Sequence, residues 1–124
     1  MPFHCASSSK VLIAYQSPEE IDRIINETPI TKYTHQTITE PEKLKKHFNE
    51  IREKGYAICK DELEEGIKAI AAPIKNVNGK VIASITITGV SKRISSNNIE
   101  ELIKVVMSSA LEISAIIGYK DKNN

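Results

Sequence analysis

The chain has 124 residues, the length of one domain with a single hydrophobic core. Seventeen basic and sixteen acidic residues leave a net charge of +1, which excludes the strong positive field of a domain that binds nucleic acid or anionic membranes directly. No apolar run reaches the roughly 18 residues that cross a bilayer, and the first residues do not form a signal peptide. The two cysteines fit neither a disulfide framework nor paired zinc ligands. These features predict one cytoplasmic domain.

The first segments of the chain predict two short helices. Small residues that run into an apolar stretch over residues 4–15 predict a buried helix with a serine-rich start. The N–H groups and hydroxyls at residues 7–9 could bind an anion there, or these serines could simply cap the helix. A capping box that begins at Ser17, with Pro18 as the first helical residue, predicts a second helix that ends near Glu27.

A third helix is predicted after a loop over residues 28–37. Leu44, Phe48 and Ile51 recur at spacings of four and three and predict its buried stripe, and Gly55 predicts its end. Its basic residues are interrupted by acidic ones and have no aromatic neighbours. A solvated helix face is therefore favoured over a contact with nucleic acid.

Residues 56–59 predict a short strand, which leads into an acidic stretch over residues 61–65. Carboxylates at a strand end can bind a metal or act as acid and base, but no second carboxylate cluster or suitably spaced histidine accompanies them, which favours a solvated connection. His4, Cys5 and Cys59 could bind a metal only if the fold gathered them. The chain also lacks a nucleophile with a paired base and a glycine-rich phosphate loop. We therefore predict no catalytic residues, no metal and no cofactor.

Residues 65–89 predict a β-hairpin, because two β-branched runs are joined by the turn sequence Asn-Val-Asn-Gly at residues 76–79. Along the second arm, Ser84, Thr86 and Thr88 occupy alternate positions. A strand would place these three hydroxyls on one face and apolar side chains on the other. A purely structural strand rarely carries such a face, so the hairpin is expected to form the floor of a small-molecule pocket.

The register of the two arms decides which residues share the hydroxyl face. A three-residue loop with Gly79 in the left-handed region pairs Asn76 with Lys80, and continuous pairing from there would turn Ala69 away from the threonines. Pro73 cannot donate a hydrogen bond to a strand ladder. A two-residue loop or a bulge would return Ala69 to the hydroxyl face, and we predict a bulge near Pro73.

A long helix is predicted to end the chain, with Asn97 as its N-cap and its last turn near Gly118. Its apolar residues recur at steps of three and four, which predicts a buried stripe that packs across the apolar face of the hairpin or against a partner helix. These residues are Ile99, Leu102, Val106, Ala110, Ile113 and Ile117, supplemented by Ile103, Val105 and Ile116.

Three stretches together resemble a known family: PFHCASSSKVLIA, ITEPEKLKKHFNEIREKGYAI and DELEEGIKAIAAPIKNVNGKVIASITITG. Their order and spacing are similar to those of the C-terminal effector-binding domain of IclR-type (isocitrate lyase regulator) transcription factors. Members of that family share a PLHA-like start, a helix ending in RGYA, an ELEPG-like turn, an IAAPV strand and a SISG-like strand. The resemblance covers nearly the whole chain. It implies an α+β fold, a GAF-like antiparallel sheet flanked by helices, without the opening strands of the full effector domain.

The resemblance implies that residues 1–124 form one domain that senses a small metabolite, often a carboxylic acid, and that has no enzyme activity. DNA would be bound only by a winged helix-turn-helix domain that lies outside this chain. A homodimer or higher homo-oligomer is expected, because a sheet without its opening strands leaves an unpaired edge. A dimerisation or structural module with a vestigial pocket is the alternative.

The resemblance also implies which positions bind the effector. The residues that follow the PLHA-like start are Ser7 and Ser8, and Ile67 follows the ELEPG-like turn. Thr86 and Thr88 keep the two hydroxyls of the SISG-like strand. The hydroxyls of these serines and threonines could donate several hydrogen bonds to a carboxylate in a mostly apolar pocket.

Two positions depart from the family pattern. Cys59 stands where an acidic residue is common, and Ala69 stands where cysteine is common, so the ligand can differ from those of other members. The complete set of implied effector-binding residues is Ser7, Ser8, Cys59, Ile67, Ala69, Thr86 and Thr88.

Overall fold

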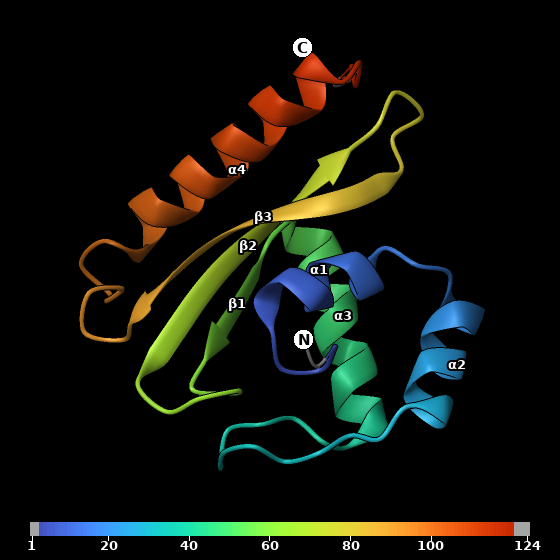
Figure 1. The fold of residues 1–124 in the computed structure, drawn as a ribbon, viewed down its shortest axis with the longest axis vertical. Coiled ribbons are helices and arrows are strands. Elements are labelled where there is room, and N and C mark those ends of the chain that lie inside the picture. The colour runs from blue at the N-terminus through green and yellow to red at the C-terminus, as the bar shows by residue number, and fades with distance from the viewer. Residues whose placement is uncertain (1–2, 121–124) are drawn as a thin grey trace.

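The structure, a computed structural model, describes residues 3–120 and has the expected α+β architecture. An antiparallel sheet has the helix α4 on one face and the helices α1 and α3 on the other (Figure 1). The strands, in the order β1-β2-β3 across the sheet, are β1 (Ala57–Lys60), β2 (Ile67–Lys75) and β3 (Val81–Val90). The helices are α1 (Ser7–Ala14), α2 (Pro18–Glu27), α3 (Pro41–Lys54) and α4 (Ile99–Ile116). Within residues 3–120, each helix is too short or too polar to span a bilayer.

Helices α2 and α3 begin and end as the sequence predicts. The Ser17 hydroxyl accepts a hydrogen bond from the Glu20 N–H over 3.2 Å, and Pro18 is the first residue of α2. Helix α3 begins at Pro41 and stops at Gly55, whose φ of 84° lies in the left-handed region that glycine adopts without strain. The side chains that α3 buries are Leu44, Phe48 and Ile51, as predicted.

Two helix starts differ from the predictions. The N-cap of α1 is Ala6, without a side-chain hydrogen bond, so the serines at residues 7–9 do not cap the helix but form its first turn. The N-cap of α4 is Asn98 and not Asn97. The Asn98 side-chain oxygen accepts a hydrogen bond from the Ser95 N–H over 2.9 Å, which closes the preceding turn and delays the helix by one residue.

The alternation of side chains along β2 divides the interior into two cores. Ala71 packs on the side of α1 and α3, whereas Ile70, Ala72 and Ile74 pack against α4. The apolar residues of β3 also face α4, which leaves its hydroxyls on the side of α1, as the sequence predicts. The buried residues of the larger core are Val11, Ala14, Ile21, Ile25, Leu44, Phe48, Ile51, Ala57 and Ala71.

The hairpin combines a three-residue loop with a bulge. The Asn76 N–H donates to the Lys80 carbonyl oxygen over 2.9 Å, and Gly79 has a φ of 79°. The register then shifts by one residue beyond Ile74, because β3 carries one extra residue, Ile82, that has no partner on β2. The predicted bulge is therefore confirmed, although the extra residue lies on β3.

The bulge sets which residues of the two arms lie opposite each other. Ala69 pairs with Thr88, and Ala71 pairs with Thr86, so the alanines share the hydroxyl face of β3. Pro73 itself lies in the regular ladder. It is tolerated there because β1 pairs with β2 only as far as Ala71, and no donor at Pro73 is needed for β1.

Helix α4 packs across the apolar face of the hairpin as predicted, but its apolar stripe is wider than the surface it covers. Only Val106, Ala110 and Ser114 are buried. The Ser114 hydroxyl accepts the Lys75 N–H over 2.9 Å and donates to the Ala110 carbonyl oxygen over 2.7 Å. The predicted buried stripe is wrong at four exposed residues, which are Val105, Ile113, Ile116 and Ile117.

Candidate functional site

A cavity of about 200 Å³ lies between the N-terminal end of α1 and the hydroxyl face of the sheet. All seven residues that the resemblance assigns to the effector site line this one cavity: Ser7, Ser8, Cys59, Ile67, Ala69, Thr86 and Thr88. Four further lining residues were missed by the sequence analysis, namely Cys5, Ala6, Leu63 and Glu64. Cys5 and Ala6 directly precede Ser7 in the chain. Leu63 and Glu64 belong to the acidic stretch over residues 61–65, here called the acidic connection.

Local features of α1 and β3 position the cavity walls. The Ser84 hydroxyl donates to the Ser8 carbonyl oxygen over 3.2 Å and so holds the first turn of α1 against β3. Of the three hydroxyls on this face of β3, that of Ser84 therefore has a structural role. Thr86 and Thr88 line the cavity, and the bulge at Ile82 brings Ala69 beside them.

Two buried hydroxyls in this cavity have no hydrogen-bond partner among the described residues, Ser7 Oγ on α1 and Thr86 Oγ1 on β3. A buried polar group without a partner costs about 1–3 kcal/mol, so such groups usually mark a site that a ligand or water completes. The first backbone N–H groups of a helix also lack intrahelical acceptors, and α1 has no side-chain cap. This arrangement can bind an oxygen-rich group such as a carboxylate.

The two thiols in the cavity are Cys5 and Cys59, both buried and free. Burial raises the pKa of Cys59 to about 12 and also raises the pKa of Cys5, so both side chains are neutral thiols near pH 7. Thiolates, rather than thiols, are nucleophiles and metal ligands. Within residues 3–120, no group of three or more His, Cys, Asp or Glu side chains could bind a metal ion.

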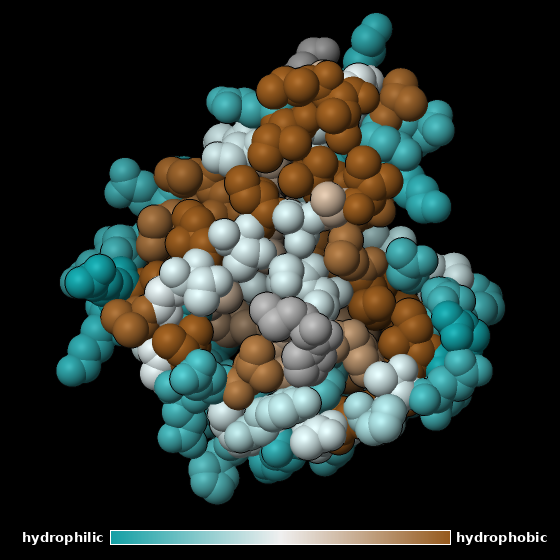
Figure 2. Space-filling view, in the orientation of Figure 1, coloured by the Kyte–Doolittle hydropathy of each residue, from teal (hydrophilic) through white to brown (hydrophobic). Residues whose placement is uncertain are grey.

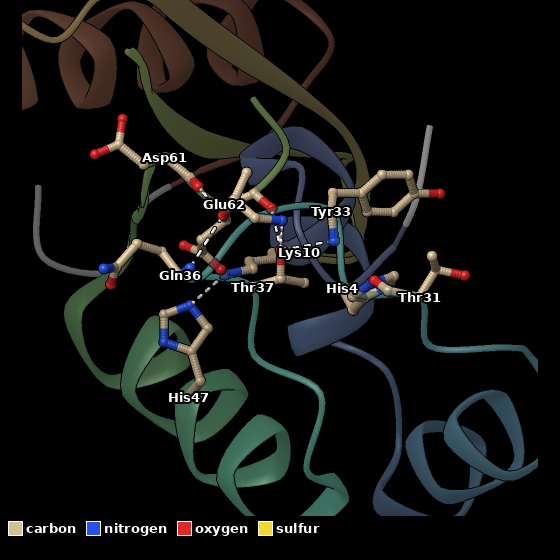
Figure 3. A network of polar contacts seen from close by, with 10 residues as sticks. His4, Lys10, Thr31, Tyr33, Gln36, Thr37, His47, Asp61 and Glu62 are labelled. Carbon is tan, nitrogen blue, oxygen red and sulfur yellow. Dashed lines mark hydrogen bonds and ion pairs between the residues drawn. The ribbon is translucent and has the colours of Figure 1, made fainter. Parts of the chain in front are cut away.

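A buried ion pair beside the cavity joins α1 to the acidic connection (Figure 3). The Lys10 side chain is fully buried, pairs with the Glu62 carboxylate, and has its Nζ 2.9 Å from His47 Nε2. The Thr37 hydroxyl donates to the Glu62 carbonyl oxygen. The predicted solvated connection over residues 61–65 is therefore wrong at Glu62, because the buried ammonium of Lys10 requires a carboxylate.

Further hydrogen bonds hold the acidic connection in place. Asp61 has a φ of 57°, a conformation that aspartate tolerates better than most residues, and its Oδ1 accepts the Gly66 N–H over 2.7 Å. The Thr34 hydroxyl donates to the Asp61 carbonyl oxygen. Since Leu63 and Glu64 lie between these contacts, they form a fixed wall of the cavity.

We expect His47 to make the stability of the protein depend on pH. Burial, with Lys10 and Lys54 nearby, lowers the pKa of His47 from 6.5 to about 4. The unfolded chain therefore binds the proton more readily, and the free energy of unfolding falls as the pH decreases from 6.5 to about 4. In thermal unfolding followed by circular dichroism, a His47→Gln variant should lose less stability over this range than the unaltered protein. Equal losses in both proteins would contradict the assignment.

The fold and the cavity define a class of α+β domains with a partly open site between a helix N-terminus and an antiparallel sheet. A family model described as "Bacterial transcriptional regulator IclR C-terminal" matches residues 1–115. The chain therefore belongs to the IclR family, whose members are transcriptional regulators and not enzymes.

Individual relatives agree with this assignment. The chain is similar to the HTH-type transcriptional regulator KdgR of Escherichia coli (strain K12), with 32% identity over 120 residues, which are 97% of this chain and 46% of that regulator. The chain thus spans about half the length of that relative. The solved C-terminal domain of E. coli KdgR matches with a TM-score of 0.89 and 32% identity, over 95% of this chain and 72% of that one.

A second protein, PobR, shares the fold at lower identity. It is the inducer binding domain of a double mutant of the PobR transcription factor from Acinetobacter, solved in complex with 3-hydroxybenzoic acid. The TM-score is 0.89 at 24% identity, over 94% of this chain and 67% of that one.

Proposed function

We propose that the chain is the effector-binding domain of an IclR-type regulator and that its cavity binds a small carboxylate-like metabolite. The observation that carries this proposal is the pair of unpartnered hydroxyls, Ser7 Oγ and Thr86 Oγ1, in one cavity at the start of α1. Residues 1–124 then form one ligand-sensing domain, and a winged helix-turn-helix domain elsewhere in the regulator binds DNA. Binding of the effector changes the DNA-binding state of the whole protein in the cytoplasm.

The lining of the cavity supports a ligand with one carboxylate and an apolar body. Among the described lining residues there is no lysine or arginine, so hydroxyls and the positive end of α1 are the groups that would stabilise an anion. Ala6, Leu63, Ile67 and Ala69 offer apolar contacts to the rest of the molecule. The acidic Glu64 repels a second carboxylate, which favours monocarboxylates over dicarboxylates.

The volume of the cavity and the PobR complex agree with this class of ligand. A space of about 200 Å³ admits only a small molecule. The PobR domain, which has the same fold, is a case in which such a domain accommodates an aromatic carboxylic acid. That ligand belongs to PobR.

Titration calorimetry with a panel of small mono- and dicarboxylic acids tests the proposal. We expect saturable binding of a monocarboxylate and about tenfold weaker binding by Thr86→Val, because one hydrogen bond to a charged group is lost. The same substitution removes a buried hydroxyl without a partner, so the ligand-free protein should keep or gain thermal stability. Thr88→Val should also weaken binding.

A Thr28→Val variant is the matched control, since Thr28 is exposed at the end of α2. It should bind the acid as the unaltered protein does. Unchanged binding by both Thr86→Val and Thr88→Val would reject the assigned site. If no acid binds and Thr86→Val destabilises the ligand-free protein, the cavity is vestigial and the domain is a structural or dimerisation module, an alternative that the departures at Cys59 and Ala69 favour.

We also propose that the chain assembles as a homodimer or higher homo-oligomer. The strand β3 is at the end of the described sheet, and an unpaired strand edge in a native protein is usually covered or paired.

A further inference from the structure

We propose that the chain has a second ligand site, separate from the effector cavity, in which Lys75 binds the carboxylate of a small aromatic acid. The site is a cavity of about 210 Å³, close in size to the effector cavity, and is here called the Lys75 cavity. No described residue lines both cavities. The inference goes beyond the proposed effector site and does not rest on it.

The Lys75 cavity lies where β2 continues past the end of β1. Strand β1 pairs with β2 only as far as Ala71, whereas β2 extends to Lys75. At this point residues from both sides of the sheet meet. Tyr15 comes from the side of α1, and Ala72 and Met107 come from the side of α4. The cavity is therefore formed between packed elements, where small-molecule sites commonly occur.

A glycine shapes one wall of the cavity. Gly55, the residue that ends α3, lines the cavity together with Met107. A Cβ atom at position 55 would lie 3.3 Å from the Met107 methyl carbon, which is tighter than ordinary contact. The methyl group of Met107 therefore packs against the backbone of Gly55, and a side chain at position 55 would displace it.

The lining of the Lys75 cavity is mostly apolar. Pro73 and Leu111 contribute apolar surface, and Figure 2 shows apolar side chains gathered over the part of the surface where Figure 1 places α4. The Ser114 hydroxyl already has two partners, because it accepts the Lys75 N–H and donates to the Ala110 carbonyl oxygen. The body of a molecule that fits this cavity is therefore apolar.

The ammonium of Lys75 is the one charged group among the described lining residues. Lys75 is half-buried, and within residues 3–120 it forms no ion pair with a carboxylate. Its Nζ lies 5.9 Å from the ring centre of Tyr15 and 5.5 Å from that of Tyr119. Aromatic rings at this distance attract an ammonium but leave its hydrogen-bond donors available. An anion in the cavity would supply the acceptor.

The charges around the cavity also favour an anion. The described lining includes no aspartate or glutamate. Burial raises the pKa of Tyr15, and the nearby Arg52 guanidinium opposes this rise only in part, so the phenol stays neutral and does not repel an anion. The effector cavity has the opposite character, since it contains Glu64 and no lysine or arginine. The two cavities therefore differ in the ligands they favour.

Tyr15 and Met107 favour an aromatic body for the ligand. A tyrosine ring and a thioether both pack well against an aromatic ring. The space of about 210 Å³ admits one small molecule. A carboxylate suits Lys75, because its oxygens accept the hydrogen bonds that an ammonium donates. Benzoate combines these two features and is the probe for the experiment.

NMR of the chain with ¹³C-labelled methionine methyl groups tests the site directly. The chain contains two methionines, Met1 and Met107, so a Met107→Leu variant identifies the Met107 signal. We expect benzoate to shift this signal saturably, with a dissociation constant of about 1 mM or lower. Benzamide has nearly the same shape but no charge, and it should bind at least about tenfold more weakly.

A lysine variant tests the role of the charge. Lys75→Leu should weaken benzoate binding at least about tenfold, because the charged partner of the carboxylate is lost. Lys80→Leu is the matched control, since Lys80 is an exposed lysine of the same hairpin and does not line the cavity. The control should bind benzoate as the unaltered chain does. Circular dichroism should show equal helix content in all three proteins.

The outcomes separate the Lys75 cavity from the effector cavity. Thr86→Val should leave the benzoate-dependent shift of Met107 unchanged. A Met107 signal that does not move up to about 10 mM benzoate, or equal affinities for benzoate and benzamide, would overturn the Lys75 site. A shift that Thr86→Val weakens and Lys75→Leu does not would place benzoate in the effector cavity, which overturns this inference and supports the effector proposal.

Discussion

A Lys10→Met variant is expected to lose about 3–5 kcal/mol of unfolding free energy, because removal of one partner leaves the other charge buried and unpaired. The Lys10 side chain is fully buried, and the Glu62 side chain that pairs with it is 9% exposed. Urea unfolding followed by circular dichroism measures the effect. The matched control is Arg23→Met, which breaks two exposed ion pairs on α2 and should cost less than about 1 kcal/mol.

A double variant separates loss of the charge pair from loss of packing. In Lys10→Met combined with Glu62→Leu, no buried charge remains, and replacement of a buried ion pair by apolar residues is often neutral. Most of the lost stability should therefore return. If the single variant costs no more than the Arg23→Met control, the ion pair does not hold α1 against the acidic connection.

An Ala69→Phe variant is expected to weaken effector binding at least about 100-fold, because the new ring occupies the cavity that the ligand needs. Ala69 is half-buried, lines the cavity and lies opposite Thr88. Calorimetry with the tightest acid from the panel measures the loss. The effect should exceed that of Thr86→Val, which removes one hydrogen bond and leaves the space open.

Two further variants keep this result interpretable. Ala115→Phe adds the same ring at an exposed position on α4 and should leave binding unchanged. Ala69→Leu fills less of the cavity, so it should weaken binding by a smaller factor than Ala69→Phe. It provides the test of the cavity if the larger ring of Ala69→Phe disturbs the fold. Full affinity in Ala69→Phe, with thermal stability retained, would show that the effector binds elsewhere.

The hairpin and the lining of the cavity could be predicted from the sequence because their signals are local. The alternation of Ser84, Thr86 and Thr88 fixes one face of β3, and the turn sequence fixes the loop. The bulge could be predicted because a three-residue loop with continuous pairing would turn Ala69 away from Thr86 and Thr88, with which it was expected to share a face. The assignment of α1 as the opposite wall came from the resemblance to the family, since nothing in the serine-rich turn shows what it faces.

The buried ion pair could not be predicted because its partners are 52 residues apart and Glu62 is one of four acidic side chains within residues 61–65. Nothing in the stretch marks which carboxylate turns inward. One signal was available: Lys10 lies within a helix that was predicted to be buried, and a buried lysine requires a partner. The exposed stripe of α4 was missed for a related reason, since periodicity shows that a face is apolar but not what covers it.

The extra residue Ile82 sets how changes in the length of β3 affect the cavity. Its side chain is 51% exposed and does not line the cavity, so replacement by another residue should be tolerated. Its deletion would leave Lys75 opposite Val81 and Ile74 opposite Ala83, so the bulge would disappear while every later pair was kept. An inserted residue, in contrast, would need a second bulge to keep Thr86 opposite Ala71, and without one it would turn the hydroxyls of β3 toward α4. The chemistry of the cavity therefore tolerates substitution or loss of residue 82 but not a longer β3.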